Sequence, residues 1–145
     1  MKKSAIVAAV LVGAVSVTML AGWGRWGGPM DAQKISRIVG AHVDNALDEV
    51  DATDAQRVKI KALQDQLVQD GIKLRDGNKE SRQALVAQWE SPTVDRDAVH
   101  SIVDKRIDDV RAFAHKVADT FISVHDILTP TQRATLSAKA KERME

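Results

Sequence analysis

The 145-residue chain has no cysteine and no tyrosine, and it contains only two phenylalanines and three prolines. Without cysteine the protein cannot form a disulfide, a thiolate metal site or a cysteine nucleophile, and it cannot carry a lipidated cysteine anchor. Strands favour aromatic and β-branched residues, and turns need glycine and proline. These shortages therefore predict a single all-α domain that is stabilised by the packing of long helices.

A near-neutral charge and the lack of catalytic motifs argue against two further classes of protein. The formal net charge is +1, and without Lys2 and Lys3 the chain has 19 basic against 20 acidic residues. A nucleic-acid partner would need a concentrated positive face. The sequence also has no glycine-rich phosphate loop and no recognisable Ser-His-Asp arrangement. We therefore expect neither an enzyme nor a bound cofactor.

The N-terminus predicts export from the cytoplasm. Lys2 and Lys3 precede an uncharged apolar run over residues 5–21, and this order is typical of a signal peptide. A cleavage site needs small residues at both −3 and −1, whereas cleavage after Ala21 or after Gly22 satisfies only one of these positions.

This imperfect site leaves two interpretations of residues 1–22 open. They are either a signal peptide that is removed or a membrane anchor that is retained, since residues 5–21 approach the roughly 20 apolar residues that span a bilayer. Both interpretations place the rest of the chain in the periplasm. Residues 23–30 are rich in glycine and predict a flexible tether ahead of a helical domain over residues 31–145.

Apolar residues recur at steps of three and four from Asp31 to Val50, which is typical of an amphipathic helix. They are Ile35, Ile38, Val39, Val43, Ala46, Leu47 and Val50. A second helix is expected to begin after Thr53, whose hydroxyl can accept a hydrogen bond from the amide three residues on. Gln56 can reach back to the amide of Thr53, which completes a capping box.

Gly71 and Gly77 weaken this second helix and leave its length ambiguous. Either it ends near Arg75 and a short helix follows, or one long, bent helix continues to Glu90. A glycine inside a helix costs only about 1 kcal/mol relative to alanine, so we favour the long helix.

The segment Ser91-Pro92-Thr93 ends this helix, because proline lacks an amide donor and disfavours helical geometry in the preceding residue. A third helix follows, with apolar positions at steps of three and four. The positions on its predicted face are Val99, Val103, Arg106, Val110, Phe113, Val117, Phe121, Val124 and Leu128. A second capping box, formed by Thr129 and Gln132 with Pro130 at the first helical position, predicts a fourth, weakly amphipathic helix.

The two Thr-x-x-Gln boxes together resemble the paired LTxxQ signature of the Spy/CpxP family of periplasmic proteins. The motif residues are Thr53, Gln56, Leu128, Thr129 and Gln132. The likeness covers roughly residues 33–140. Ala52 stands where the pattern of the first motif has leucine, which predicts one apolar contact fewer beside that cap.

The resemblance implies a hooked four-helix arrangement whose two subunits pair antiparallel into a thin, curved homodimer. It implies ATP-independent, chaperone-like protection of unfolded or misfolded envelope proteins in the envelope stress response, or restraint of a stress-sensing kinase. Heavy-metal sensors are among the relatives, and His42 and His125 are the candidate metal ligands here. Since Ala46 lies one turn after His42, no His-x-x-x-His pair exists to hold an ion, which counts against sensing.

Replacing Thr129 by alanine should lower the free energy of unfolding by about 1 kcal/mol, because the first amides of the last helix lose their side-chain acceptor. Thermal unfolding followed by circular dichroism measures this change. An unaltered midpoint would show that the last helix begins elsewhere.

Overall fold

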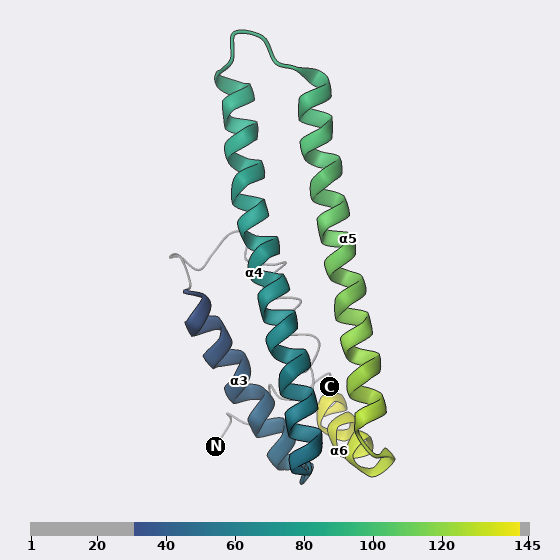
Figure 1. The fold of residues 1–145 in the computed structure, drawn as a ribbon. Coiled ribbons are helices and arrows are strands. Elements are labelled where there is room, and N and C mark those ends of the chain that lie inside the picture. Colours follow the sequence, from purple (N-terminus) through teal and green to yellow (C-terminus); the bar gives the residue numbers. More distant parts are fainter. Residues whose placement is uncertain (1–30, 143–145) are drawn as a thin grey trace.

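The computed structural model describes residues 31–142, which fold into helices joined by short links (Figure 1). The helices are α3 (Ala32–Glu49), α4 (Asp54–Glu90), α5 (Arg96–Ile127) and α6 (Pro130–Lys141). These residues contain no strand, so the all-α prediction is confirmed. The predicted leader over residues 1–22 and the predicted tether over residues 23–30 lie outside the described residues. None of the described helices combines the length and apolar character that a bilayer crossing requires.

The two longest helices, α4 and α5, run antiparallel as a hairpin, and the short helices lie against one end of it (Figure 1). With 37 residues, α4 is about 55 Å long. We call the end that holds the start of α4 and the whole of α6 the base, and the opposite end the tip. Towards the tip, the described part of the chain consists of the paired ends of α4 and α5 (Figure 1).

α4 is continuous, as predicted, and it passes through both glycines without a break. Gly71 is buried and Gly77 faces α5, and the low helix propensity of these two residues, about 1 kcal/mol each, is small for a helix of 37 residues. The helix ends before Ser91 and Pro92, as the sequence indicates. α5 then begins after Asp95, whose carboxylate accepts from the amide of Ala98 at 3.0 Å.

Buried apolar side chains form two clusters, both in the half of the molecule nearest the base. The lower core contains Val43, Leu47, Val50, Ala52, Ile60, Val124 and Leu128. Leu136 of α6 packs against it, although no residue of α6 is itself buried. The middle core contains Leu67, Leu74 and Phe113. Beyond Leu74, no residue of α4 is buried, so apolar packing fades towards the tip.

The predicted apolar face of α5 is only partly correct. Phe113 and Val124 are buried, but Phe121 is 56% exposed and Val103 is also exposed. The apolar surface of α5 is wider than the strip that α4 covers, so residues on its flank remain about half exposed. The sequence pattern identified apolar positions, but it could not tell which of them α4 covers.

Arg106 occupies a position on this face where an apolar residue would be expected. Its guanidinium donates to the backbone carbonyl oxygen of Leu74 on α4 at 2.8 Å. A Cβ atom at Gly77 would lie 4.0 Å from the same nitrogen, so glycine leaves the guanidinium ample room. Arg106 therefore fastens α5 to α4 just where the buried apolar packing ends.

Asp70 and Lys116 form a second polar contact between these helices, with 3.0 Å between carboxylate and ammonium. The Asp70 side chain is only 8% exposed, whereas that of Lys116 is half exposed. Burial alone would raise the pKa of Asp70. Hydrogen bonds from Lys116 and Gln66, together with the positive charges of Lys116 and Lys73, outweigh burial and hold this pKa below its ordinary value.

Asp70→Asn should lower the free energy of unfolding by about 1 kcal/mol at pH 6, because the contact with Lys116 loses its charge. A carboxylate whose pKa is lowered by folding stabilises the protein above the unfolded-state pKa, and this contribution disappears as the pH falls. The difference from the native protein should therefore shrink below about pH 4. Urea unfolding between pH 6 and pH 3 measures it.

Asp119→Asn is the matched control, since Asp119 is exposed on α5 and makes no ion pair within residues 31–142. A pH-independent difference for Asp70→Asn, or an equal difference for the control, would contradict the proposed role of this charge.

Candidate functional site

Both predicted capping boxes form, and both lie at the base. The amide of Gln56 donates to the hydroxyl of Thr53 at 3.3 Å, and the amide of Thr53 donates to Gln56 Oε1 at 2.9 Å. The distances at Thr129 and Gln132 are the same, 3.3 Å and 2.9 Å. Each box satisfies two helix-terminal amides that have no partner within the helix.

The two glutamine side chains also bind each other. Gln56 Nε2 donates to Gln132 Oε1 at 2.9 Å, and Gln132 Nε2 donates to Gln56 Oε1 at 3.1 Å. We call the set Thr53, Gln56, Thr129 and Gln132 the glutamine clasp. It joins the turn between α3 and α4 to the turn between α5 and α6, so the motif residues do more than cap their own helices.

Each glutamine of the clasp also reaches a backbone carbonyl of the opposite turn. Gln56 Nε2 donates to the carbonyl oxygen of Ile127 at 2.9 Å, and Gln132 Nε2 donates to that of Val50 at 3.2 Å. A primary amide has two N–H donors and two acceptor sites, and both side chains use all four. The clasp is therefore a fully satisfied, partly buried network with near-twofold symmetry.

Two arginines extend this symmetry, and the sequence analysis did not identify them. Arg57 Nε donates to the carbonyl oxygen of Ala52 at 3.0 Å, and Arg133 Nη1 donates to that of Leu128 at 2.5 Å. Each arginine directly follows the glutamine of its motif, so the repeated unit is Thr-x-x-Gln-Arg. This repeated arginine in the sequence could have identified both residues as part of the motif. The arginines bind the carbonyl that precedes each box, where no helix amide is available.

The residue before each threonine lies in the lower core. Leu128 and Ala52 are both buried, so the alanine keeps an apolar place beside the first cap despite its smaller side chain. Asp51 has a φ of 50°, and the amides of Asp51 and Ala52 donate to the carbonyls of Asp48 and Leu47. These two bonds form a Schellman motif that ends α3 and directs the chain into the first box.

The candidate metal ligands are not part of a metal-binding cluster. Within residues 31–142, no three His, Asp or Glu side chains gather closely enough to hold an ion. His125 Nδ1 lies 3.0 Å from a carboxylate oxygen of Asp126. His42 is half-buried on α3.

Comparison with known proteins gives one result. A family model described as LTXXQ motif family protein matches residues 39–140, a span that includes both motifs and most of the four helices. No curated protein matches the chain, and no solved structure matches it.

A double-mutant cycle tests whether the two caps are coupled. Gln56→Ala and Gln132→Ala should each lower the free energy of unfolding by about 2 kcal/mol, since each leaves partly buried partners unsatisfied. The double variant should lose about 1 kcal/mol less than the sum, because either change already breaks the bonds between the two amides. Urea unfolding at neutral pH measures all four proteins.

Gln69→Ala is the control, since Gln69 is an exposed glutamine of α4, and its change should stay within about 0.5 kcal/mol. If the changes in the free energy of unfolding for Gln56→Ala and Gln132→Ala were strictly additive, the two caps would be independent and the proposed coupling through the clasp would be wrong.

Proposed function

We propose that this chain, which belongs to the LTXXQ motif family, is a periplasmic, ATP-independent binding protein that holds unfolded or misfolded envelope proteins. Family membership supports a Spy/CpxP-like periplasmic protein in general. The chaperone-like activity is our inference from the surface of the hairpin. The sequence has no phosphate-binding loop, in keeping with a non-enzymatic protein that acts without a nucleotide.

The observation that carries this proposal is a set of exposed apolar side chains on the hairpin. The tip patch consists of Leu85, Val86, Trp89 and Val94. The α5 row consists of Val103, Ile107, Phe121 and Ile122. Trp89 is 86% exposed, and the members of the α5 row are each about half exposed. Several large apolar side chains exposed along one pair of helices typically mark a contact site for another protein.

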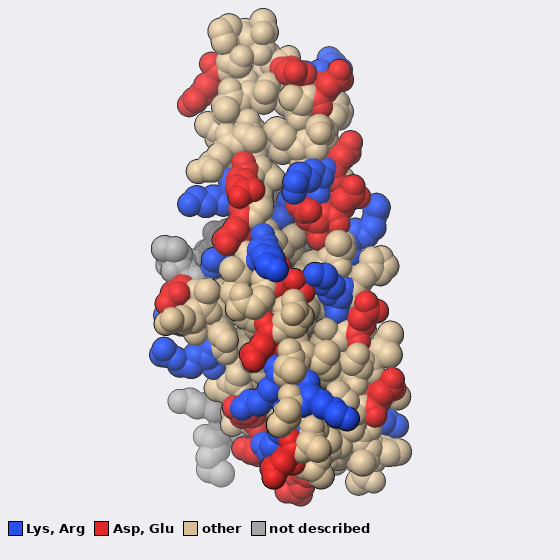
Figure 2. All heavy atoms as spheres, viewed as in Figure 1, with Lys and Arg blue, Asp and Glu red and all other residues tan. Residues whose placement is uncertain are grey.

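Two features suit this surface to unfolded chains. The α5 row extends from Val103 to Ile122, about 28 Å along the helix, which is long enough for an extended segment to follow. Charged side chains cover the base and the middle of this face, and fewer of them lie at the tip (Figure 2). An extended apolar segment could therefore bind without desolvating many charges.

We also propose that two copies pair antiparallel, as the resemblance implies. Residues 83–103 around the tip patch carry three acids and one base. The start of α4 carries Arg57, Lys59 and Lys61, but Arg57 is bound to Asp48 and Lys61 to Asp44 of α3. An antiparallel pair would bring the tip of one copy, with its excess of two acids, towards Lys59 and the 72% exposed Val58 of the other.

An aggregation assay with a chemically denatured enzyme as client tests the proposed function. The purified protein at equimolar concentration, without nucleotide, should suppress light scattering. The double variants V86S/W89S in the tip patch and I107S/F121S in the α5 row should each need about tenfold more protein for the same effect, because each loses roughly 1–2 kcal/mol of apolar contact.

Ile38→Ser is the control, because it removes an exposed isoleucine of α3 that lies outside both patches and outside the proposed pairing surface. Sedimentation of each variant should accompany the assay, since loss of pairing would otherwise be mistaken for loss of client binding. Failure of the native protein to suppress aggregation would refute the proposed function.

A further inference from the structure

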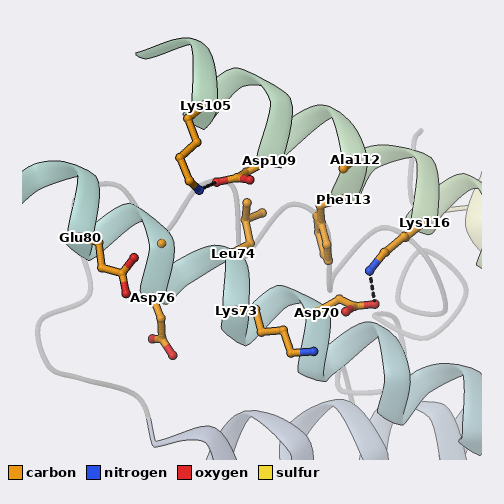
Figure 3. Close-up of a pocket in the computed structure, with 11 residues that line it drawn as sticks. Asp70, Lys73, Leu74, Asp76, Glu80, Lys105, Asp109, Ala112, Phe113 and Lys116 are labelled. Atoms are coloured by element: carbon orange, nitrogen blue, oxygen red, sulfur yellow. Dashed lines mark hydrogen bonds and ion pairs between the residues drawn. The ribbon is translucent and has the colours of Figure 1, made fainter. Parts of the chain in front are cut away.

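A groove of about 470 Å³ lies between α4 and α5 at the height of the middle core (Figure 3). Leu74 and Phe113 lie between the two helices in its centre, and Gly77 and Ala112 add no bulk to its walls. A Cβ atom at Gly77 would meet nothing nearer than 3.9 Å, so this glycine keeps part of the groove empty. The groove is open to solvent along its length, so a chain segment could lie in it without entering an enclosed cavity.

Most charged side chains around the groove are already paired. Lys105 binds Asp109 at 2.8 Å, and Lys116 binds Asp70 at 3.0 Å, as the dashed lines of Figure 3 mark. Asp76 lies 3.2 Å from the guanidinium of its neighbour Arg75. In each of these pairs a positive side chain neutralises a negative one, so the paired side chains attract a charged ligand only weakly.

Lys73 and Glu80 are different. Both line the groove, and neither makes an ion pair or a hydrogen bond within residues 31–142, although the positive charge of Lys73 also acts on Asp70. They lie seven positions apart on α4, so they share one face of the helix and are separated by about 10 Å along it. The groove therefore has one basic side chain, Lys73, on the side nearer the lower end of the hairpin, and one acidic side chain, Glu80, on the side nearer the tip. Apolar residues lie between them.

We propose that this groove binds an extended peptide segment that carries an acid and a base about three residues apart, with apolar side chains between them. An extended chain rises about 3.3 Å per residue, so three residues match the spacing of Lys73 and Glu80. The acid of the segment pairs with Lys73 and its base pairs with Glu80. The apolar side chains between them lie over Gly77 and Ala112, above Leu74 and Phe113, which are only 7% and 4% exposed.

This inference deepens the proposed function and rests on it for its biological meaning, since it names a class of client segment. It adds a preference that the exposed apolar patches cannot supply. Apolar contact is non-directional, whereas a base and an acid at a fixed separation select segments by charge pattern.

Fluorescence anisotropy with labelled, end-blocked hexapeptides tests the inference on the full-length protein. The peptide Gly-Lys-Leu-Leu-Glu-Gly should bind about fivefold more tightly than Gly-Glu-Leu-Leu-Glu-Gly or Gly-Lys-Leu-Leu-Lys-Gly, since each control loses one half-exposed ion pair. Charge reversal in the protein should redirect this preference. Glu80→Lys should favour the peptide with two acids, and Lys73→Glu should favour the peptide with two bases.

A variant that fills the groove provides a second readout. Gly77→Leu should weaken binding of the mixed-charge peptide about tenfold, because its side chain occupies the apolar centre. Ala87→Leu, at an exposed position of α4 outside the groove, should leave binding unchanged. Circular dichroism should show that both variants remain folded. Gly77→Leu should not weaken α4 itself, because leucine has a higher helix propensity than glycine.

Equal affinity for the three peptides, or charge-reversal variants that keep the preference of the native protein, would overturn the inference. Peptide binding that survives Gly77→Leu would overturn it as well. The outcome is separable from the proposed function, because aggregation suppression depends on the tip patch and the α5 row. If the protein suppresses aggregation but shows no preference among the peptides, the inference about the groove is wrong and the proposed function still stands.

Discussion

The mutual hydrogen bonding of Gln56 and Gln132 is the constraint on which this fold depends. It holds the turn before α4 against the turn before α6, although the two glutamines are 76 residues apart in the sequence. Each hydrogen bond contributes only about 1 kcal/mol net, but a partly buried amide that lost its partner would cost more. The lower core assembles around these two turns, so polar network and apolar packing stabilise the same junction.

This concentration of contacts at the base explains the rest of the surface. α6 has no buried residue and is held by the clasp, by Leu136 on the lower core and by the contact of Lys139 with Glu49 at 2.7 Å. Within residues 31–142, the upper hairpin is formed by α4 and α5 alone, and it has no cluster of buried apolar side chains. A two-helix layer cannot bury all of its apolar side chains, so some remain available to other proteins. Stability and binding surface are thus divided between the two halves of the molecule.

Local signals in the sequence predicted the helices well. The two capping boxes, the stop at Pro92 and the apolar periodicity gave the four helices, and the continuity of α4 followed from the small cost of single glycines. The pairing of the clasp was not predictable in this way, because a capping box is a local pattern and its second set of partners lies on another turn. Arg57 and Arg133 were missed for the same reason. The groove depends on which face of α5 meets α4, and periodicity alone does not determine that contact.

The distance between the clasp and the tip has a mechanical consequence. A helix pair about 55 Å long that is fastened at one end behaves as a cantilever, in which a rotation of about 5° at the fixed end displaces the free end by about 5 Å. Small adjustments of packing around Leu128 would thus be amplified at Trp89. Such leverage would let a slender molecule move its tip without unfolding any helix.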